Sequence, residues 1–512
     1  MIQIKEYTGH IRNWRALLPE LGIDPACSRA EREREIILKG YEKWGNGLGA
    51  RLHGMFAIIL YDDAEDRTVC IRDPFGTRTL YYYVTGDGRF LAGHSIRKIM
   101  EMPGFRKELN HDALELYLTF SYPAGEETFF KGLKKLMPGR VLVWQNGKMQ
   151  IKRFWQPKYE PDYTKTEQDF ADMINECAKE LFAECIEEGE EPESFLSGGV
   201  DSAYIAAMSE VKAVNSIGYT DKRFDESYLA EEIAQILGKK FNRCVIEPEQ
   251  YFEEVPYVMY NMEQPLADAS AIVFSIGCKA TAEHARLVYS GEASDEFFCG
   301  YHIFHNAQKY ADNLEERYIG NTNIMKEDEK KRILKNYTGN ILPIDVSKPL
   351  FSETKGMHPL TKMQNVDVQI YFDGDIQLNV DKMSAAADLE IRMPLLDTRM
   401  FEIAASIPPE MKLTDEQTKV VFRKAAEAVL PEEIAQRKKL GFIVPIRIWL
   451  ADERYNSDVR KKFTGKTAEQ FFNTDEIMKI YNDYVGGEDL LWRKIWVIYT
   501  FLVWYEEYFV KR

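Results

Sequence analysis

The chain has 512 residues, of which 45% are apolar, and its formal net charge is −16. This length and composition predict a globular protein of two to four domains with large cores. The acidic balance argues against a nucleic-acid partner, because the phosphates of a nucleic acid would be repelled.

The cysteines and the apolar runs bear on location. The seven cysteines are scattered and include no Cys-x-x-Cys pair, which predicts reduced thiols in a reducing compartment and no zinc site. The first residues show no signal-peptide pattern, and the longest apolar run, Ile495 to Tyr505, is about half of a bilayer span. We therefore expect a cytoplasmic protein with no membrane partner.

Residues 1–157 are expected to form one domain built on antiparallel strands. Short apolar runs alternate with turns, and Asn146-Gly147 is a strong hairpin signal. The predicted strands are Gly54–Tyr61, Thr68–Ile71, Leu80–Val84, Arg89–Ala92, Arg140–Trp144 and Met149–Trp155. The following polar segment contains two prolines and is typical of a linker.

Residues 165–512 are expected to form a second domain. A long helix from Glu167 to about Glu187 is followed by alternating strands and helices, which predicts a parallel sheet covered by helices. Such sheets bind ligands at the carboxyl ends of their strands. The aromatic helix near the C-terminus is most simply explained as core packing.

The loop Leu196-Ser197-Gly198-Gly199-Val200-Asp201-Ser202 lies between a predicted strand and a predicted helix. Adjacent glycines let the backbone approach a ligand closely, and free N–H groups at a helix start suit an anion. A carboxylate beside a phosphate is repelled unless a cation lies between them, so we interpret Asp201 as a Mg²⁺ ligand. The alternative is a simple Gly-Gly turn with a helix-capping residue.

A second cluster follows the predicted strand 287–289. It contains Ser290, Gly291 and three carboxylates, Glu292, Asp295 and Glu296, which helical spacing would place on one face. Three anions on one face repel each other, so a role in metal binding or proton transfer explains them better than a structural role.

These motifs resemble those of known enzymes. Ser-Gly-Gly-Val-Asp-Ser is similar to the pyrophosphate-binding loop of the ATP pyrophosphatases. The segment 290–301, the run Leu389–Asp397 and Arg72-Asp73-Pro74-Phe75-Gly76 resemble motifs of glutamine-dependent asparagine synthetases. The resemblance covers nearly the whole chain. It implies an α/β protein with a truncated Ntn-hydrolase-like antiparallel β sandwich, then a doubly wound parallel-sheet ATP-pyrophosphatase domain with a helical C-terminal part.

The resemblance also implies site residues. Asp201 and Asp295 would share Mg²⁺, Glu292 would be the acid/base residue, and Lys439 would neutralise charge on the α-phosphate and the leaving pyrophosphate. In related lactam-forming synthetases the position of Glu292 is a Tyr, so its identity favours an amide synthetase. The implied ATP-binding residues are Leu196, Ser197, Gly198, Gly199, Asp201, Ser202, Ile217, Ser290 and Gly291.

Four further positions keep two interpretations each. Asp268 is either close to the nucleotide or a helix cap. Glu390 and Arg392, together with Asp381, match family motifs and could equally form a buried ion-pair network.

The N-terminal part departs from the family pattern. Residue 2 is Ile where the family has its nucleophilic Cys, and about forty residues that would precede Tyr7 are missing. The glutamine-holding Asn and Glu are replaced by Thr8 and His10. Acyl-enzyme chemistry needs its nucleophile, so we predict no glutaminase activity and expect His10 to be a surface residue of a decayed site.

The resulting functional prediction is an ATP-dependent carbon–nitrogen ligase that uses ATP and Mg²⁺. It would adenylate a carboxylate and transfer ammonia to it, with aspartate giving asparagine as the leading pair, and release AMP and pyrophosphate. The alternatives are amidation or lactam formation on another carboxylate with another amine, and a subunit supplied by a separate glutaminase chain. The sequence also leaves open whether the chain forms a homodimer.

Overall fold

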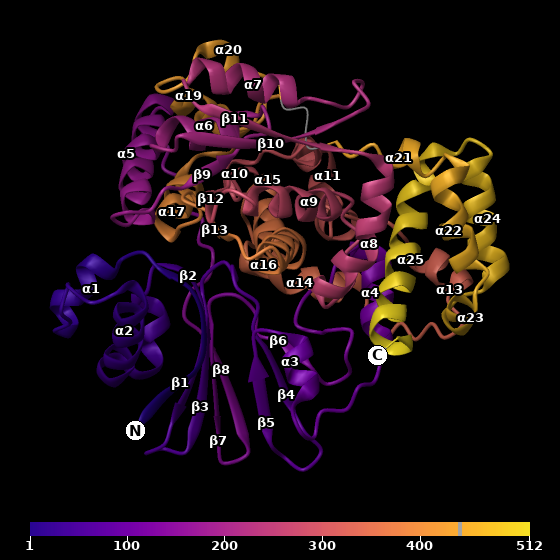
Figure 1. Cartoon of the computed structure of the whole chain (residues 1–512), viewed down its shortest axis with the longest axis horizontal. Coiled ribbons are helices and arrows are strands. Elements are labelled where there is room, and N and C mark those ends of the chain that lie inside the picture. Colours follow the sequence, from indigo (N-terminus) through magenta and orange to yellow (C-terminus); the bar gives the residue numbers. More distant parts are fainter. Residues whose placement is uncertain (439–442, 512) are drawn as a thin grey trace.

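The computed structural model describes residues 1–438 and 443–511. Its N-terminal part contains two antiparallel sheets (Figure 1). The five-stranded sheet has the order β1-β2-β3-β7-β8, with strands Ile2–Ile11, Gly54–Asp62, Arg67–Arg72, Arg140–Gln145 and Lys148–Arg153. The three-stranded sheet has the order β5-β4-β6, with strands Phe90–Gly93, Tyr81–Val84 and Lys134–Lys135. Asn146 and Gly147 both take positive φ, as a type I′ hairpin requires.

The two faces of the larger sheet follow the period-two pattern of a strand. Ala57 and Ile59 of β2 share a buried cluster with Tyr82 of the smaller sheet and with Leu136, which follows β6. The alternate residues of β2 pack against helices α1 (Trp14–Leu21) and α2 (Arg29–Trp44). The predicted β sandwich is therefore confirmed, with two helices on its outer face.

The second part is organised around a five-stranded parallel sheet of order β11-β10-β9-β12-β13. Its strands are Lys240–Ile246, Ala213–Tyr219, Glu193–Phe195, Leu287–Tyr289 and Glu390–Arg392. The direction of winding reverses between β9 and β12, and a crevice opens at the carboxyl ends of strands where this happens. The α/β class is confirmed, and the sheet topology singles out the loops after β9 and β12.

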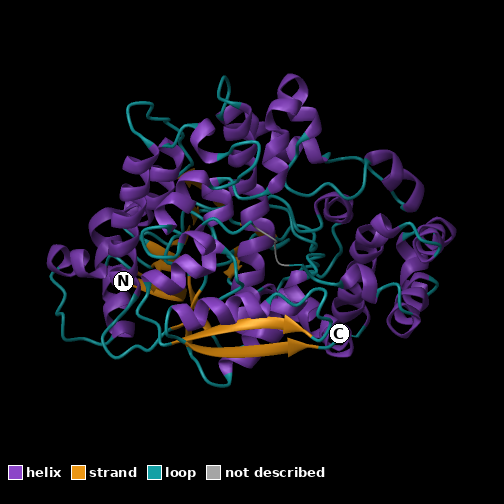
Figure 2. Cartoon of the chain, turned by 90° about the horizontal axis from the view of Figure 1, so that it is seen from above, coloured by secondary structure: helices purple, strands orange, loops and turns teal. Residues whose placement is uncertain are grey.

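Helices cover both faces of this sheet, as the view from above in Figure 2 shows. Val214 of β10 lies in the cluster that contains α5, α6, α7 and α19, whereas Ile217 packs against α9 on the other face. The flanking helices are α5 (Glu167–Cys185), α6 (Val200–Met208), α7 (Ser227–Ile236), α8 (Pro248–Met262), α9 (Ser270–Ala282), α16 (Gln377–Ala386), α17 (Thr398–Ser406) and α19 (Val420–Ala426).

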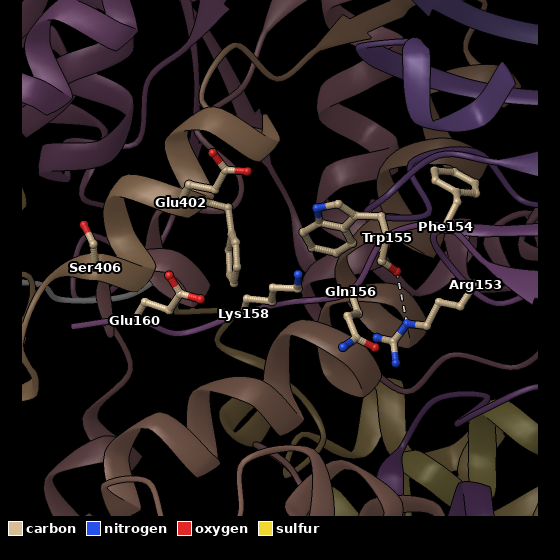
Figure 3. A pocket seen from close by; sticks show the side chains of 9 residues that line it. Arg153, Phe154, Trp155, Gln156, Lys158, Glu160, Glu402 and Ser406 are labelled. Carbon is tan, nitrogen blue, oxygen red and sulfur yellow. Dashed lines mark hydrogen bonds between the residues drawn. The ribbon is translucent and has the colours of Figure 1, made fainter. Parts of the chain in front are cut away.

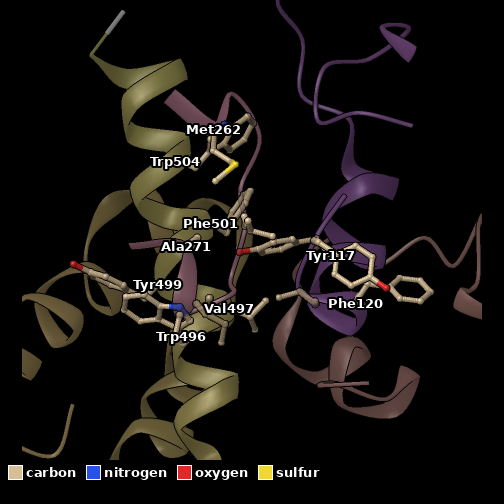
Figure 4. Close-up of a cluster of buried hydrophobic side chains, with 14 of the residues drawn as sticks. Tyr117, Phe120, Met262, Ala271, Trp496, Val497, Tyr499, Phe501 and Trp504 are labelled. Atoms are coloured by element: carbon tan, nitrogen blue, oxygen red, sulfur yellow. The ribbon is translucent and has the colours of Figure 1, made fainter. Parts of the chain in front are cut away.

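The C-terminal helices, yellow in Figure 1, form a lobe at one side of the molecule, and Figure 4 shows side chains of the core beneath them. Helix α25 (Trp492–Tyr505) packs against α22 (Glu453–Phe463) and α24 (Thr474–Val485). Its Trp504 and Phe501 rings pack in the same cluster as Tyr117 and Phe120 of α4 (His111–Phe120). The expectation that this aromatic helix serves packing is confirmed, and the N-terminal helix α4 contributes to that core. Among the described residues, no helix combines the length and apolarity needed to cross a bilayer.

Partly exposed and buried ion pairs join the N-terminal part to the rest of the chain. Arg29 forms a two-pronged contact with Glu390, at 3.0 Å to each carboxylate oxygen, and Arg392 pairs with Glu390 at 2.7 Å. Arg78 lies 3.3 Å from Asp381. The ion-pair interpretation of Asp381, Glu390 and Arg392 is therefore confirmed.

A further buried ion pair is centred on Asp373, which is 2% exposed. Its oxygens lie 2.8 Å from Arg72 Nη2 and 2.6 Å from Lys135 Nζ, both from the N-terminal part. Asp373 belongs to a π-helical segment, η4 (Asp367–Ile376), that leads directly into α16. π-Helical segments are rare in proteins, and those that occur are frequently found at functional sites.

Candidate active site

The loop after β9 is shaped by its two glycines. Gly198 takes φ of +86°, and a Cβ there would lie 2.9 Å from the Cβ of Leu229. Ser197 N–H donates to Ser202 Oγ at 3.0 Å, which ties the strand end to the first turn of α6. Gly199 caps the start of α6, and the helix begins at Val200. The loop therefore has the compact strand–loop–helix geometry that its sequence predicts.

The loop after β12 meets this first loop. A Cβ on Gly291 would lie 3.3 Å from the carbonyl carbon of Asp201, so only a residue without a side chain fits there comfortably. Ser290 N–H donates to the carbonyl of Arg392 at 3.0 Å, and its hydroxyl donates to Glu292 at 3.2 Å. Two loops that are about ninety residues apart in sequence thus converge at the reversal point of the sheet.

Asp201 and Asp295 converge on one cation that the sequence analysis did not identify. Lys419 Nζ lies 2.5 Å from Asp201 Oδ1 and 2.7 Å from Asp295 Oδ1, and its side chain is 0% exposed. Lys419 also has φ of +58°, a left-handed conformation that costs a non-glycine residue about 1–3 kcal/mol. No sequence pattern distinguishes it from an exposed lysine, because its burial depends on residues more than a hundred positions away.

Gly300 leaves the space in which this contact forms. A Cβ on Gly300 would lie 1.8 Å from Asp295 Oδ1 and 2.1 Å from Lys419 Cε. Gly300→Ala is therefore expected to separate Lys419 from Asp295 and to lower the rate of the enzyme's reaction at least about 100-fold, as misplacement of about 1 Å can do. The measurement is kcat of the variant against Gly47→Ala, whose Cβ would meet no atom within 4 Å. Wild-type activity in Gly300→Ala would show that the Lys419–Asp295 contact is dispensable.

Arg423 supports the same region from α19. It donates to the carbonyl oxygens of Thr418, Ala435 and Arg437, at 2.9, 2.9 and 2.7 Å. Burial lowers the pKa of Arg423, while the charges of Asp201 and Asp295 act in the opposite direction. Arg423 thus fixes the chain two residues before Lys439, which lies outside the described residues.

The three carboxylates of the second loop do not share one helical face. Helix α10 (Ser294–Phe298) begins after Glu292, which is half-buried in the preceding loop. Asp295 points to Lys419, whereas Glu296 is buried and accepts a hydrogen bond from Tyr301 at 2.5 Å. Burial, together with the charges of Asp295 and Glu292, raises the pKa of Glu296 to about 8. The sequence analysis treated the three as equivalent because it extended the helix too far toward the N-terminus.

Two other predicted residues lie around this site. Ile217 occupies the carboxyl half of β10, and its side chain contacts Gly277 of α9, which agrees with a packing role for the side chain. The Asp268 carboxylate accepts a hydrogen bond from Ser270 N–H at 2.9 Å, but the N-cap of α9 is Ala269, which has no side-chain capping bond, so the position of Asp268 close to the nucleotide stays a prediction.

The strand that contains His10 packs against helix α2. His10 is buried, at 2% exposure, and lies 3.4 Å from Glu33, so the expectation of a surface histidine was wrong. Burial lowers the pKa of His10, which keeps its imidazole neutral near pH 7. Arg29 contacts Glu33 at 3.5 Å and also the carbonyl of Gly9 at 3.3 Å. The side chains in this region are thus engaged with each other.

A cavity of about 690 Å³ lies elsewhere, between residues 153–160 and α17 (Figure 3). The rings of Trp155 and Phe401, which line it, are 5.6 Å apart at their centres. None of the predicted site residues lines this cavity.

The fold and the two converging loops define a nucleotide-binding α/β protein with an amidotransferase-like sandwich. The asparagine synthase family model matches residues 179–506, and the glutamine amidotransferase domain model matches residues 4–155. The chain belongs to the asparagine synthase family, and it is an ATP-dependent carbon–nitrogen ligase.

Several named relatives are similar over most of their length. "Asparagine synthetase [glutamine-hydrolyzing] 1" of Bacillus subtilis is 30% identical, over 99% of this chain and 86% of the relative. A "Putative asparagine synthetase [glutamine-hydrolyzing]" of Mycobacterium tuberculosis is 27% identical, over 98% of this chain and 83% of the relative. "Amidase chyE" of Penicillium rubens is 24% identical, over 81% of this chain and 73% of the relative.

Proposed function

We propose that this ligase adenylates a carboxylate with ATP and transfers ammonia to it, with aspartate giving asparagine as the leading pair. The observation that carries the proposal is the convergence of Asp201, Asp295 and the buried Lys419 at the carboxyl ends of β9 and β12. Cations next to a glycine-rich loop at a helix start suit the triphosphate of a nucleotide. The reaction would release AMP and pyrophosphate.

ATP would lie along the two loops, at Leu196, Ser197, Gly198, Gly199, Ser202, Ser290 and Gly291, with the backbone of Ile217 near the adenine. Asp201 and Asp295 would hold Mg²⁺, because two converging carboxylates are the protein ligands that this ion takes beside phosphate oxygens. When bound, the ion would neutralise phosphate charge. Lys419 supplies positive charge at the same point and orients both carboxylates. The role of Lys439 as a second positive charge beside the phosphates stays a prediction.

Glu292 is proposed to accept the proton of the attacking amine. It lies in the loop that joins β12 to the helix bearing Asp295, and Ser290 holds its carboxylate by a hydrogen bond. A carboxylate in reach of both the acyl group and the amine can remove a proton as the carbon–nitrogen bond forms.

We also propose that residues 1–157 and 165–512 are two domains and that the first has no glutaminase activity. Separate sheets support the division, and two hydrophobic clusters contain residues of both parts and join them. The replacement of the glutamine-holding Asn and Glu by Thr8 and His10, and the His10–Glu33 and Arg29–Glu33 contacts, support the loss of activity. The nitrogen would then come from free ammonia, another amine or a separate glutaminase chain.

The second candidate function is the same type of reaction with a carboxylate other than aspartate. A relative named an amidase lies in the same range of similarity as some named asparagine synthetases, which favours keeping amidation or lactam formation on another carboxylate. A cytoplasmic location is proposed because all seven cysteines are free thiols. A homodimer is also proposed as one possible oligomeric state of the chain.

The test is pyrophosphate release with ATP, Mg²⁺, aspartate and ammonium chloride, repeated with glutamine in place of ammonium. We expect release with ammonium and only background release with glutamine, with Asp295→Asn defining that background. Equal rates with the two nitrogen sources would refute the loss of glutaminase activity. If the protein binds ATP but aspartate does not increase pyrophosphate release, the substrate is a carboxylate other than aspartate.

A further inference from the structure

The helix that carries Asp295 is too short to hold its own shape. Helix α10 has five residues, and a helix of this length depends on contacts with the rest of the fold. The last carbonyl groups of a helix also lack partners within it. The Asp295 carbonyl accepts the N–H of Gly300 at 2.8 Å. The carbonyl oxygens of Glu296 and Phe297 must find donors from another element.

A glutamine from a different helix supplies those donors. Gln364 lies in α15 (Pro359–Val366) and is fully buried. Its amide nitrogen donates to the carbonyl oxygen of Glu296 at 2.9 Å and to that of Phe297 at 2.6 Å. The amide therefore uses both of its N–H donors on the C-terminal end of α10. Gln364 fixes that end of the helix, and with it the residue one position before Glu296, which is Asp295.

A buried lysine sets the orientation of this amide. Lys412 is the last residue of α18 (Pro409–Lys412), and its Nζ donates to Gln364 Oε1 at 3.0 Å. Because the ammonium group of a lysine only donates hydrogen bonds, it keeps the amide oxygen on its own side and directs the amide nitrogen toward α10. A positive charge near the C-terminal end of a helix also suits the helix dipole.

The burial of Lys412 is costly and is not offset by a carboxylate. Lys412 is 3% exposed, and burial lowers its pKa to about 8. Within residues 1–438 and 443–511 it forms no ion pair, and its Nζ lies 6.0 Å from the centre of the Tyr159 ring. Buried charges normally have a charged partner, as Lys330 has in Glu327 at 2.5 Å. A role in orienting the Gln364 amide explains why a lysine is kept at position 412.

Asp295 is thus held from two directions. Lys419 contacts the side chain at Oδ1, at 2.7 Å, whereas Gln364 holds the backbone of the helix just beyond Asp295. A shift of about 1 Å in a group of this kind is enough to impair a reaction. Residues that orient a metal ligand without touching the metal likewise affect how tightly the metal binds.

We propose that Gln364 and Lys412 are positioning residues, which hold α10 so that the Asp295 carboxylate is oriented toward the Mg²⁺ of the nucleotide. The role rests on the proposed function, in which Asp201 and Asp295 hold that ion. Both residues act through the backbone of α10. Loss of either should weaken the binding of Mg²⁺ and leave the affinity for the metal-free nucleotide unchanged.

The first test compares Gln364→Met with Asn365→Leu. Asn365 is also fully buried in α15 and donates its amide to a backbone carbonyl, that of Leu350, at 2.9 Å. Both variants lose a buried amide, so both should have a lower Tm. The Mg²⁺ concentration for half-maximal pyrophosphate release should rise at least about 10-fold in Gln364→Met, as when an orienting partner of a metal ligand is removed, and should not change in Asn365→Leu. Equal values in the two variants would overturn the proposal.

Gln364→Glu provides the same test with less change in volume. A carboxylate still accepts the hydrogen bond from Lys412 but cannot donate to the two carbonyl groups of α10. We expect a rise in the Mg²⁺ requirement of the same size as in Gln364→Met. A wild-type Mg²⁺ requirement in Gln364→Glu would overturn the role of the two hydrogen bonds.

Lys412→Met is paired with Lys330→Met, which also removes a buried lysine. Lys330 donates to the carbonyl of Glu115 at 3.0 Å and pairs with Glu327, so it contacts other parts of the fold than α10. The Mg²⁺ requirement should rise in Lys412→Met and stay at the wild-type value in Lys330→Met. A rise of equal size in both variants would remove Lys412 from the proposal.

A measurement without turnover separates the positioning role from the proposed function. With α,β-methylene-ATP, whose α–β bridge is not cleaved, Mg²⁺ should raise the Tm of the wild type above the value with the analogue alone. The Mg²⁺ concentration for half of this rise should be at least about 10-fold higher in Gln364→Met. An unchanged concentration would overturn the positioning role even if amide formation is found. A changed concentration without any carboxylate-dependent pyrophosphate release would keep the positioning role and refute the proposed function.

Discussion

Replacing Lys419 by Met is expected to lower the rate of pyrophosphate release about 10²–10³-fold, the usual effect of removing one preorganised charge stabiliser. Met has similar volume but no charge, so Asp201 and Asp295 would face each other without the ammonium group that now lies 2.5 and 2.7 Å from them. Carboxylates that repel each other would also move apart. The measurement is single-turnover pyrophosphate release at saturating ATP.

Lys424→Met is the matched control for this variant. Lys424 lies on the same helix, α19, but only approaches Glu167, at 3.8 Å, near the surface. We expect its rate to stay within about twofold of the wild type, as for surface positions generally. If Lys419→Met released pyrophosphate as fast as Lys424→Met, the role given to Lys419 would have to be withdrawn.

The second large effect concerns stability. Asp373→Ala is expected to lower the free energy of unfolding by about 3–5 kcal/mol, because it leaves the buried charges of Arg72 and Lys135 without their carboxylate. The side chains of Arg72 and Asp373 are each 1% exposed, so water cannot compensate for the loss. Denaturant unfolding followed by tryptophan fluorescence measures the change.

The control is Asp87→Ala, which removes an exposed ion pair with Arg89. Its side chains are 61% and 52% exposed, so a change below about 1 kcal/mol is expected. Equal losses in the two variants would show that burial does not set the value of the Asp373 contact.

The Asp373 contact also predicts a pH dependence. Burial alone would raise the pKa of Asp373, but Arg72 and Lys135 more than offset it and hold the pKa below its ordinary value. A carboxyl group whose pKa is lower in the folded state contributes stability above its unfolded pKa of about 3.9 and loses it as the pH falls further. The difference between wild type and Asp373→Ala should therefore be constant at neutral pH and shrink below about pH 4.

Local signals account for what the sequence could predict. Gly198 and Gly291 mark close backbone approach, and Asn146-Gly147 fixes a hairpin, because each depends on the residue's own conformational range. Sheet topology then brings the two glycine-containing loops together, since both follow strands that meet where the winding reverses. The class of fold and the meeting of the two loops therefore follow from short segments, whereas the pairing of Asp201 with Asp295 was implied by the family resemblance.

Long-range burial accounts for what the sequence could not predict. Lys419 and His10 are polar residues whose depth is set by elements distant in the chain, and neither carries a local mark of burial. The start of α10 was also missed, because Ala293 takes φ of +83° where a helix would require a negative value. Such a conformation is rare for alanine and is imposed by its surroundings.

The ion pairs between the two parts of the chain limit how far the N-terminal part can be dispensed with. Arg12, Arg29, Arg72 and Arg78 each neutralise an acidic residue of the second part, at Asp397, Glu390, Asp373 and Asp381. Removing residues 1–157 would leave all four acidic groups without these arginine partners. One of them is Asp373 of the π-helix η4. The N-terminal sandwich thus supplies counter-charges that the second part requires, whatever reaction it carries out itself, and we expect that the second part alone would not fold stably.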